Sequence, residues 1–369
     1  IVQLTVNRKI ENWEPFSEKG NEKYSLTRNL YKSRYGNKII FEEINHNLNL
    51  AFKYEWCSSN KYGFIRTSTI TNVGNEKKEL RVLDGMQNIL PHGAGADLQM
   101  RQSNLIDAYK RTELDIISGL GIFSLSAIIV DRAEPSEALK ANIVWQNGIE
   151  NPKYLVSSLQ LSSFIAGKAI IQEDDIKAEK GAYFVESNIS LTSGESKDWF
   201  MAVDVNKSHS AVASIAKDVT TKGIADRVKA DIDAGNEELV KLAASADGLQ
   251  HTADTLKDTR HFSNVMFNIM RGGIFDNNYQ IEKWDLIAYL KEASEKAFAN
   301  NKSSLDALND EFSIVELQNV IQSSNDPAFK RLVSEYLPLK FSRRHGDPSR
   351  PWNAFSINTR SEVDGSKIL

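Results

Sequence analysis

Between residues 24 and 205, hydrophobic and polar positions alternate with a period of two, the pattern of strands that have one buried face. Runs rich in β-branched and aromatic residues cover positions 34–44, 48–56 and 63–85. In the last run, the turn-forming residues 72–75 separate two alternating halves. We therefore expect residues 63–85 to form a β-hairpin.

Two further strand pairs are expected, one joining residues 122–130 to 139–148 and one joining residues 182–191 to 198–205. In the final strand the apolar side chains that begin with Trp199 share one face. This half of the chain contains neither alternating helices nor the glycine pattern of a Rossmann fold or a P-loop. The pattern therefore predicts a large antiparallel β-sandwich rather than a parallel α/β sheet.

After Val205 the apolar residues recur every three or four positions, which indicates helices. A capping box is predicted at Ser313 and Glu316, and Asp326 is expected to cap a helix that opens at Pro327. The second part of the chain is therefore expected to be all-α. Helical segments are expected at residues 208–219, 223–248, 257–273 and 281–301, and the stretch 208–258 is expected to be a connector more than a core.

These patterns divide the chain into a predicted antiparallel β-sandwich domain at residues 1–205, a helical linker at 206–260 and an α-helical region at 261–369. A length of 369 residues exceeds the usual single-domain size and allows more than one core. The chain opens on Ile1 rather than methionine and stops in a loop, so we expect a piece cut from a longer protein.

Composition adds several exclusions. A hydrophobic content of 41% and a charged content of 25% are ordinary for a globular protein. A formal net charge of −4 without a lysine-rich block offers no electrostatic footprint for nucleic acid. The longest apolar run, residues 116–130, is shorter than the roughly 18 to 20 residues that span a bilayer. We therefore expect no nucleic acid and no membrane as partners, and read this run as a buried strand.

Cysteine and histidine usage argues against metal and thiol chemistry. Cys57 is the single cysteine, so it cannot form an internal disulfide, and beside Trp56 it is expected to be a packed residue. A cytoplasmic location is slightly favoured, although the compartment stays open. The six histidines lack any metal-binding spacing, so we expect no metal and no other cofactor.

The order of a many-stranded sandwich, a helical linker and an α-helical region resembles the cellobiose phosphorylase family and its relatives among the six-hairpin glycosidases. The resemblance rests on residues 63–85, on residues 124–148 and on the change from sheet to helix after residues 200–205. It implies a galactose-mutarotase-like supersandwich followed by the beginning of an (α/α) barrel. It also implies a carbohydrate-active parent whose catalytic carboxylate lies in barrel loops beyond Leu369, so no catalytic residue is assigned to this chain.

A loop near the end of the chain is the first candidate for substrate binding. Arginine forks suit phosphate or carboxylate groups, prolines preset the backbone, and a tryptophan can stack on a sugar face. The alternative is a domain junction locked by Arg–Asp pairs and a buried tryptophan. The candidate residues are Arg343, Arg344, His345, Asp347, Arg350 and Trp352.

Two other segments are weaker candidates. In residues 271–285, Asp276 and Asn277 suit sugar hydroxyls, although a helix end followed by a turn explains the same letters. Residues 83–104 are expected to form a long polar loop, in which His92 and Asp97 are marginal candidates and an interface is favoured over a ligand site.

The sequence thus predicts the non-catalytic, amino-terminal portion of a glycoside hydrolase or glycoside phosphorylase, which shapes carbohydrate binding, substrate access or a dimer contact. Its expected partner is an oligosaccharide or sugar, and inorganic phosphate and a homodimer stay open. One alternative is a stand-alone carbohydrate-binding or structural module. Another is an epimerase of the mutarotase type, which needs a histidine and a glutamate in one cleft, with His46 near Glu42 and Glu43 as the weak candidates.

Overall fold

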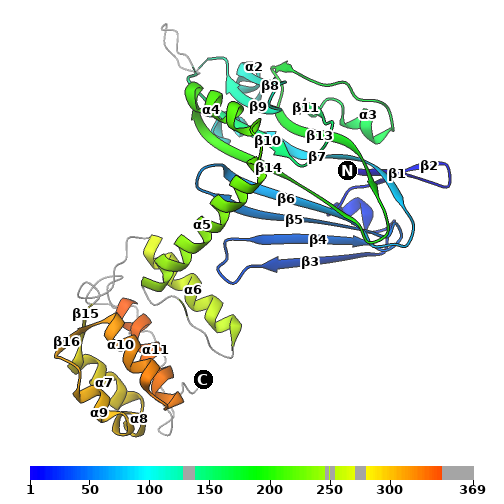
Figure 1. The fold of residues 1–369 in the computed structure, drawn as a ribbon. Coiled ribbons are helices and arrows are strands. Elements are labelled where there is room, and N and C mark those ends of the chain that lie inside the picture. The colour runs from blue at the N-terminus through cyan, green and yellow to red at the C-terminus, as the bar shows by residue number, and fades with distance from the viewer. Residues whose placement is uncertain (128–137, 246–248, 250–253, 271–279, 343–369) are drawn as a thin grey trace. The chain divides into compact units, whose positions relative to one another are not determined.

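The chain is described by a computed structural model that covers residues 1–127, 138–245, 249, 254–270 and 280–342 (Figure 1). It forms two compact units. The first unit comprises residues 1–33 and 37–236, and the second comprises residues 34–36 and 237–369 as far as they are described.

The first unit contains a nine-stranded and a five-stranded sheet, and every strand pairing in them is antiparallel. The nine-stranded sheet has the order β12 (Asp175–Lys177), β8 (Lys110–Asp115), β9 (Leu120–Leu125), β10 (Lys140–Asn147), β14 (Ser196–Ser208), β6 (Gly63–Asn72), β5 (Leu50–Ser59), β4 (Ile39–Asn45) and β3 (Leu26–Lys32). The five-stranded sheet has the order β11 (Lys153–Ser157), β13 (Gly181–Leu191), β7 (Lys78–Ile89), β1 (Val2–Val6) and β2 (Lys9–Trp13).

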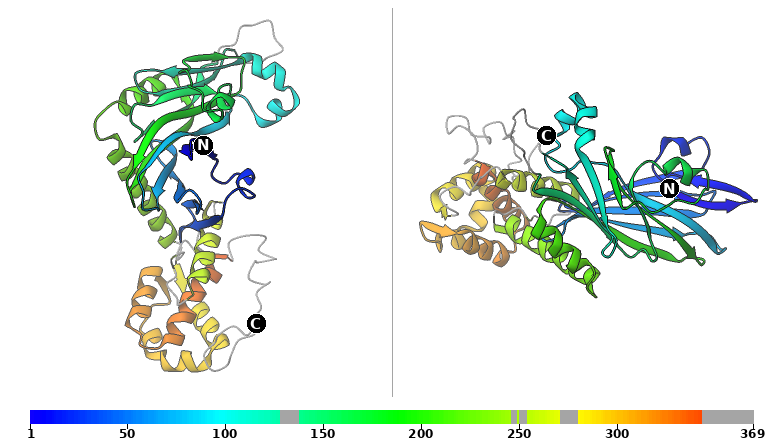
Figure 2. Two further views of the ribbon diagram at one scale, coloured as in Figure 1. Left: turned by 90° about the vertical axis from the view of Figure 1, so that its right-hand side faces the viewer. Right: turned by 90° about the horizontal axis from the view of Figure 1, so that it is seen from above.

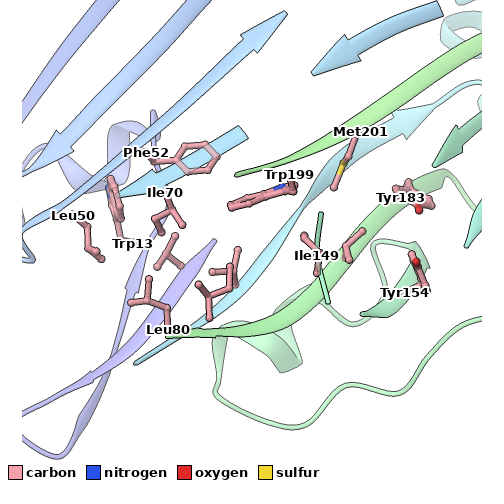
Figure 3. Close-up of a cluster of buried hydrophobic side chains, with 14 of the residues drawn as sticks. Trp13, Leu50, Phe52, Ile70, Leu80, Ile149, Tyr154, Tyr183, Trp199 and Met201 are labelled. Carbon is pink, nitrogen blue, oxygen red and sulfur yellow. The ribbon is translucent and has the colours of Figure 1, made fainter. Parts of the chain in front are cut away.

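The two sheets pack face to face around one apolar core. Phe52, Trp199 and Met201 of the larger sheet lie against Leu80 and Tyr183 of the smaller sheet (Figure 3). Each of these side chains is less than a tenth exposed. The predicted β-sandwich is therefore confirmed, and so is the helical region that follows it.

Helices cover the outer face of the larger sheet. Ser208 caps α4 (His209–Val219) by accepting a hydrogen bond from the amide of Ala211 at 3.3 Å. The start of α5 (Ile224–Ser245) runs beside the larger sheet (Figure 2). There Ile224 and Val228 belong to one buried cluster with Trp145 of the sheet. The first part of the stretch predicted as a mere connector therefore belongs to a core, because the sheet is apolar on both faces.

Two predicted strand pairs are wrong in their pairing. Strands β6 and β7 exist as predicted, but β6 pairs with β5 and β14 in the larger sheet, whereas β7 pairs with β1 and β13 in the smaller one. Residues 182–191 and 198–205 lie in β13 and β14, which also belong to different sheets. The pair formed by β9 and β10 is confirmed.

Asn72 links the two connections that cross between the sheets. Its buried side-chain amide donates to the carbonyls of Glu76 at 2.7 Å, Thr192 at 3.0 Å and Leu191 at 3.2 Å. Its side-chain oxygen accepts from the amide of Gly74 at 3.1 Å. The β6–β7 and β13–β14 crossings thus lie side by side and share one polar tie. Local turn residues could not reveal this long-range partner.

Residues 83–104 are also more ordered than predicted, because β7 continues to Ile89 and the rest includes two short helices. These are α1 (Ala96–Arg101) and α2 (Ser103–Tyr109), where Ile106 packs against Leu125. On the outer face of the smaller sheet, α3 (Leu161–Ile165) buries Phe164. A 3-10 turn, η1 (Glu18–Gly20), precedes β3.

The predicted buried strand at 116–130 is shorter than expected. Ile116 and Ile117 are 61% and 88% exposed in the turn before β9. Within the described part of the chain, no helix is long and apolar enough to cross a membrane.

The second unit is mainly helical, with a small antiparallel pair of strands that the all-α prediction missed. Its elements are α6 (Thr255–Met270), β15 (Gln280–Glu282), α7 (Lys283–Ala293), α8 (Glu295–Asn300), α9 (Lys302–Asp306), β16 (Glu311–Ser313), α10 (Ile314–Ser323) and α11 (Pro327–Ser342). The helix predicted at 281–301 is thus divided, because Ser294 ends α7 and caps α8.

Residues 280–338, hereafter the helical module, contain a strand–helix repeat. Ile281 and Phe312, Leu286 and Leu317, and Phe298 and Phe329 are each 31 positions apart, and all six side chains are buried. Ile281 and Phe312 also face each other in the β15–β16 pair. One apolar pattern, used twice, therefore builds a single core.

Polar contacts in the helical module lie mostly at helix ends. The predicted capping box is confirmed, because the Ser313 hydroxyl accepts from the amide of Glu316 and the Glu316 carboxylate accepts from the amide of Ser313. Asp326 caps α11, as predicted, by accepting from the amide of Ala328 at 2.9 Å. The Lys283 ammonium group donates to the carbonyls of Asp306 and Leu308, at 2.9 and 2.8 Å.

Candidate functional site

The main residues predicted for substrate binding lie outside the described residues. This applies to Asp276 and Asn277 and to the terminal group Arg343, Arg344, His345, Asp347, Arg350 and Trp352. Their proposed roles therefore stay predictions. Of the marginal candidates, His92 is half-buried in the connection after β7, and Asp97 is exposed in the first turn of α1.

The histidine and glutamates considered for an epimerase have separate partners. His46 is exposed and its ring nitrogen Nε2 lies 2.8 Å from the Thr27 hydroxyl. Glu42 accepts from Asn29 and Tyr31, at 2.9 and 3.0 Å. Glu43, in contrast, is fully buried on the opposite face of β4. These three side chains therefore do not form an acid–base pair.

The structure instead contains a pocket of about 310 Å³ between the inner face of the larger sheet and strands β1 and β7 of the smaller one. It is lined by aromatic and aliphatic side chains and one ion pair, and we call it the aromatic pocket. The lining residues are Ile1, Val2, Pro15, Phe16, Phe52, Tyr54, Trp56, Arg66, Val82 and Asp84. The volume is at the lower end of the range of about 300 to 1,000 Å³ that is usual for ligand pockets. Walls that are mainly aromatic and carry a few polar groups are typical of such sites.

The polar floor of the aromatic pocket is an ion pair between the sheets. Arg66 of β6 donates to the carboxylate of Asp84 of β7, and the two side chains are only 10% and 12% exposed. Asp84 also accepts from the indole nitrogen of Trp199 at 2.7 Å and from the Ser68 hydroxyl at 3.3 Å. Arg66 donates as well to the carbonyl of Gly85 at 3.0 Å. The carboxylate is therefore held in place by three side chains of the larger sheet.

One hydrogen-bond donor of Arg66 nevertheless has no acceptor within the described residues. Its Nε atom is buried and, among the residues that the structure describes, has no hydrogen-bond partner. A buried donor without a partner costs about 1 to 3 kcal/mol. In native proteins such groups are few, and each calls for an explanation.

Aromatic side chains of the larger sheet form one wall. Tyr54 stacks on Phe41 with ring centroids 5.0 Å apart, and Phe16 meets the Tyr54 ring edge-on at 5.1 Å. Burial raises the pKa of the Tyr54 hydroxyl, while Arg66 lowers it and Asp84 raises it. Tyr54 lines the same pocket as Arg66 and Asp84.

Phe16 takes a strained backbone conformation at the pocket, with φ of 67°. Such a conformation is a genuine outlier for a bulky residue. It is held by Glu43, which accepts from the amide of Phe16 at 2.9 Å, from the indole of Trp13 at 2.7 Å and from Arg28 at 2.6 Å. The buried carboxylate thus preorganises the segment that carries the aromatic ring.

Sequence reasoning missed this site, although one signal was present. Arg66 alternates in register with Ser68 and Ile70, so it is a charged residue on the apolar face of a strand. The role of Asp84 was hidden, because the predicted hairpin placed both residues in the same sheet. Only the observed crossing brings Asp84 to Arg66 from the opposite layer.

The aromatic pocket combines apolar walls with hydrogen-bonding groups, and one carboxylate occurs among its described lining residues. Glycoside cleavage uses a pair of carboxyl groups on either side of the scissile bond, or one such acid facing phosphate. Asp84 is the only carboxylate among the described lining residues, and it is engaged by Arg66. No group of three or more potential metal ligands occurs within the described ranges. Cys57 is packed as predicted, and burial raises the pKa of its thiol to about 11.

Comparison with protein families gives one match. Residues 275–338 match the model described as glycoside hydrolase family 149 insertion domain 1. This range covers the whole helical module. That part of the chain is therefore similar to an insertion domain of a glycoside hydrolase family. The comparison with curated proteins found no match.

Solved structures with partial similarity include several carbohydrate-active proteins. A bacterial glucoamylase in complex with acarbose is 10% identical, with a TM-score of 0.37 over 87% of this chain and 50% of its own. A family GH92 alpha-mannosidase from Bacteroides thetaiotaomicron is 8% identical, with a TM-score of 0.34 over 73% of this chain and 32% of its own. A protein described as a kojibiose phosphorylase from the human microbiome is 6% identical, with a TM-score of 0.29 over 71% of this chain and 27% of its own.

These TM-scores are too low to support an argument about function. The chain spans between about a quarter and a half of the length of these three structures.

Proposed function

We propose that this chain is the non-catalytic, amino-terminal portion of a larger carbohydrate-active enzyme of the glycoside hydrolase or glycoside phosphorylase type. The observation that carries the proposal is the match of residues 275–338 to an insertion domain of a glycoside hydrolase family. The aromatic pocket supports the non-catalytic part, since its described lining has one carboxylate where cleavage needs a pair of groups.

The finer architecture is part of the same proposal. The β-sandwich corresponds to a galactose-mutarotase-like supersandwich, residues 206–260 to a helical linker, and residues 261–369 to a region that leads into an (α/α) barrel. The insertion-domain match occupies much of that last region. On this proposal the helical module is an added domain that precedes the barrel. The catalytic groups then lie in the barrel.

The partners follow from the same reasoning. The substrate is an oligosaccharide or a sugar, and a phosphorylase would also use inorganic phosphate. The loop residues at 343–352 then serve substrate access or a domain junction. A homodimer contact is a further role for this portion.

An activity assay tests the proposal. The 369-residue chain and the longer gene product are incubated with gluco-oligosaccharides, with and without inorganic phosphate, and released sugar and sugar phosphate are measured. We expect turnover only for the longer product. Turnover by the 369-residue chain alone would overturn its non-catalytic role.

A second candidate is a stand-alone carbohydrate-binding module. It is favoured by the aromatic pocket, because all of the pocket's described lining comes from the first unit. The reading frame of the gene separates the two candidates. A stop codon close to Leu369 favours the module, and several hundred further codons for paired helices favour the enzyme portion.

A further inference from the structure

We infer that the aromatic pocket is a binding site for one uncharged sugar ring, held by Arg66 and Asp84 below and by the aromatic wall at its side. The inference rests on the proposed function for its choice of sugars among neutral polyhydroxyl molecules. Two observations support the site itself: the pocket geometry, and the Arg66 Nε donor that has no acceptor among the described residues.

The charge of the polar floor favours a neutral ligand. Arg66 and Asp84 cancel each other at the base of the pocket, and burial lowers the pKa of the Ile1 amino group that also lines it, which favours the uncharged amine. A ligand anion therefore gains from the guanidinium and loses to the carboxylate. A hydroxyl group suits both partners, because it donates to a carboxylate and accepts from a guanidinium. Neighbouring hydroxyls of a sugar ring offer several such contacts at once.

The Nε donor of Arg66 is the specific reason to expect a ligand oxygen in this pocket. Arg66 is 8% exposed, and within the described residues its Nε atom is without a hydrogen-bond acceptor. The other nitrogens of the guanidinium are engaged by Asp84, by the Gly85 carbonyl and by the Met201 sulfur. That atom has almost no accessible surface, so an oxygen of the ligand, or a water molecule that the ligand holds, would supply the missing acceptor once the guanidinium turns toward the pocket.

The aromatic wall supplies the apolar contact that a sugar ring needs. Tyr54 and Trp56 come from the same face of β5, and Trp56 lies directly opposite Arg66 in the β5–β6 pairing. The apolar face of a sugar ring can rest on such side chains while its hydroxyls turn toward the ion pair. Phe16 is fixed beforehand by Glu43, so closing this wall costs little ordering on binding.

Binding is tested by saturation-transfer NMR and calorimetry on the 369-residue chain, with cellobiose and maltose as neutral probes and glucuronate as the charged probe. We expect saturation of the neutral probes, weaker binding of glucuronate, and loss of affinity of about ten-fold in Trp56→Ala. Trp284→Ala is the matched control, because Trp284 is 70% exposed in the helical module. This control should bind as the parent chain does.

Several results would overturn the inference. They are the absence of binding for both neutral probes, tighter binding of glucuronate, and equal losses in Trp56→Ala and Trp284→Ala. Tyr54→Phe keeps the ring and guards against a folding defect in Trp56→Ala, and unchanged dispersion of its NMR spectrum reports an intact sandwich. Its binding of the neutral probes should stay within about three-fold of the parent chain, and abolished binding in this folded variant would contradict a stacking wall.

The last part of the test measures binding of the same probes by the longer gene product. If it binds the neutral probes at a second site that Trp56→Ala removes, the inference holds whether or not the product turns over sugar. If the 369-residue chain binds and the longer product does not, further chain fills the pocket and the inference fails. Absence of turnover with intact binding would contradict the proposed enzyme but not the pocket.

Discussion

In the β-sandwich, buried polar side chains connect segments about 120 positions apart, whereas in the helical module the buried Tyr336 hydroxyl donates to Asp285 over 51 positions and several other polar contacts are helix caps. Asn72 reaches residues about 120 positions away, and Asp84 accepts from Trp199 across the sandwich. In the helical module, Ser313 and Asp326 cap the helices that follow them, and Asp326 also accepts from the side-chain amide of Asn301 at 3.0 Å. The module relies instead on an apolar pattern that occurs twice.

This difference shows where a binding site can arise. The helical module has one apolar core built from the repeat, and the buried Tyr336 hydroxyl donates to Asp285 at 2.6 Å beside it. The sandwich buries charged groups between its layers and leaves the Nε donor of Arg66 without an acceptor among the described residues. Polar groups at the boundary of two layers can serve both the fold and a ligand.

The largest expected effect is in the apolar repeat. Phe329 is fully buried, and Phe329→Ala should destabilise the helical module by about 4 kcal/mol through the cavity it leaves. Thermal unfolding followed by NMR signals of each unit separates the two transitions. The sandwich signals should keep their midpoint. A parallel shift of both transitions would contradict independent cores.

The second largest effect is expected at Asn72, whose side chain links two chain connections of the sandwich. Asn72→Ala leaves buried carbonyls of two chain crossings without their donor, which should cost about 2 to 3 kcal/mol. Denaturant unfolding of the sandwich measures the change. Asn188→Ala on exposed β13 surface is the control and should stay within about 0.5 kcal/mol of the parent chain. Similar values for both variants would remove Asn72 from its proposed role.

Lys283 tests how much the polar contacts of the helical module contribute to its free energy of unfolding. Lys283→Met removes the donor to the Asp306 and Leu308 carbonyls while keeping the side-chain stem, and should cost about 1 kcal/mol. Lys302→Met at an exposed helix position is the control. A loss as large as that of Phe329→Ala would show that the module also depends on a central polar contact.

Cys57 gives the smallest expected effect. Because burial raises its thiol pKa to about 11, the reactive thiolate is scarce at neutral pH, and the side chain is shielded. A thiol reagent at pH 8 should label the native chain slowly and the denatured chain at once. Fast native labelling would mean that the helices over the outer face of the larger sheet open readily.

Much of the fold can be read from the sequence, because period two and period three-to-four patterns report which face of an element is buried. Strands β6, β7, β13 and β14 and the cap at Ser313 were predictable in this way. Their pairing was not, since an alternating strand followed by a turn looks the same whether the chain folds back or crosses to another layer.

The candidate site shows the same limit. The inward position of Arg66 follows from alternation with Ile70, but its partner Asp84 depends on which sheet β7 joins. The main residues predicted for substrate binding follow from side-chain chemistry and loop composition, and they lie outside the described residues. Chemistry that depends on two layers becomes visible only when the crossing is known.

Product formation from gluco-oligosaccharides tests the central claim most directly, measured side by side for the 369-residue chain and the longer gene product with and without phosphate. The account predicts that sugar or sugar phosphate accumulates only with the longer product. Accumulation with the 369-residue chain alone, abolished by Asp84→Asn, would contradict it by making this portion the enzyme itself.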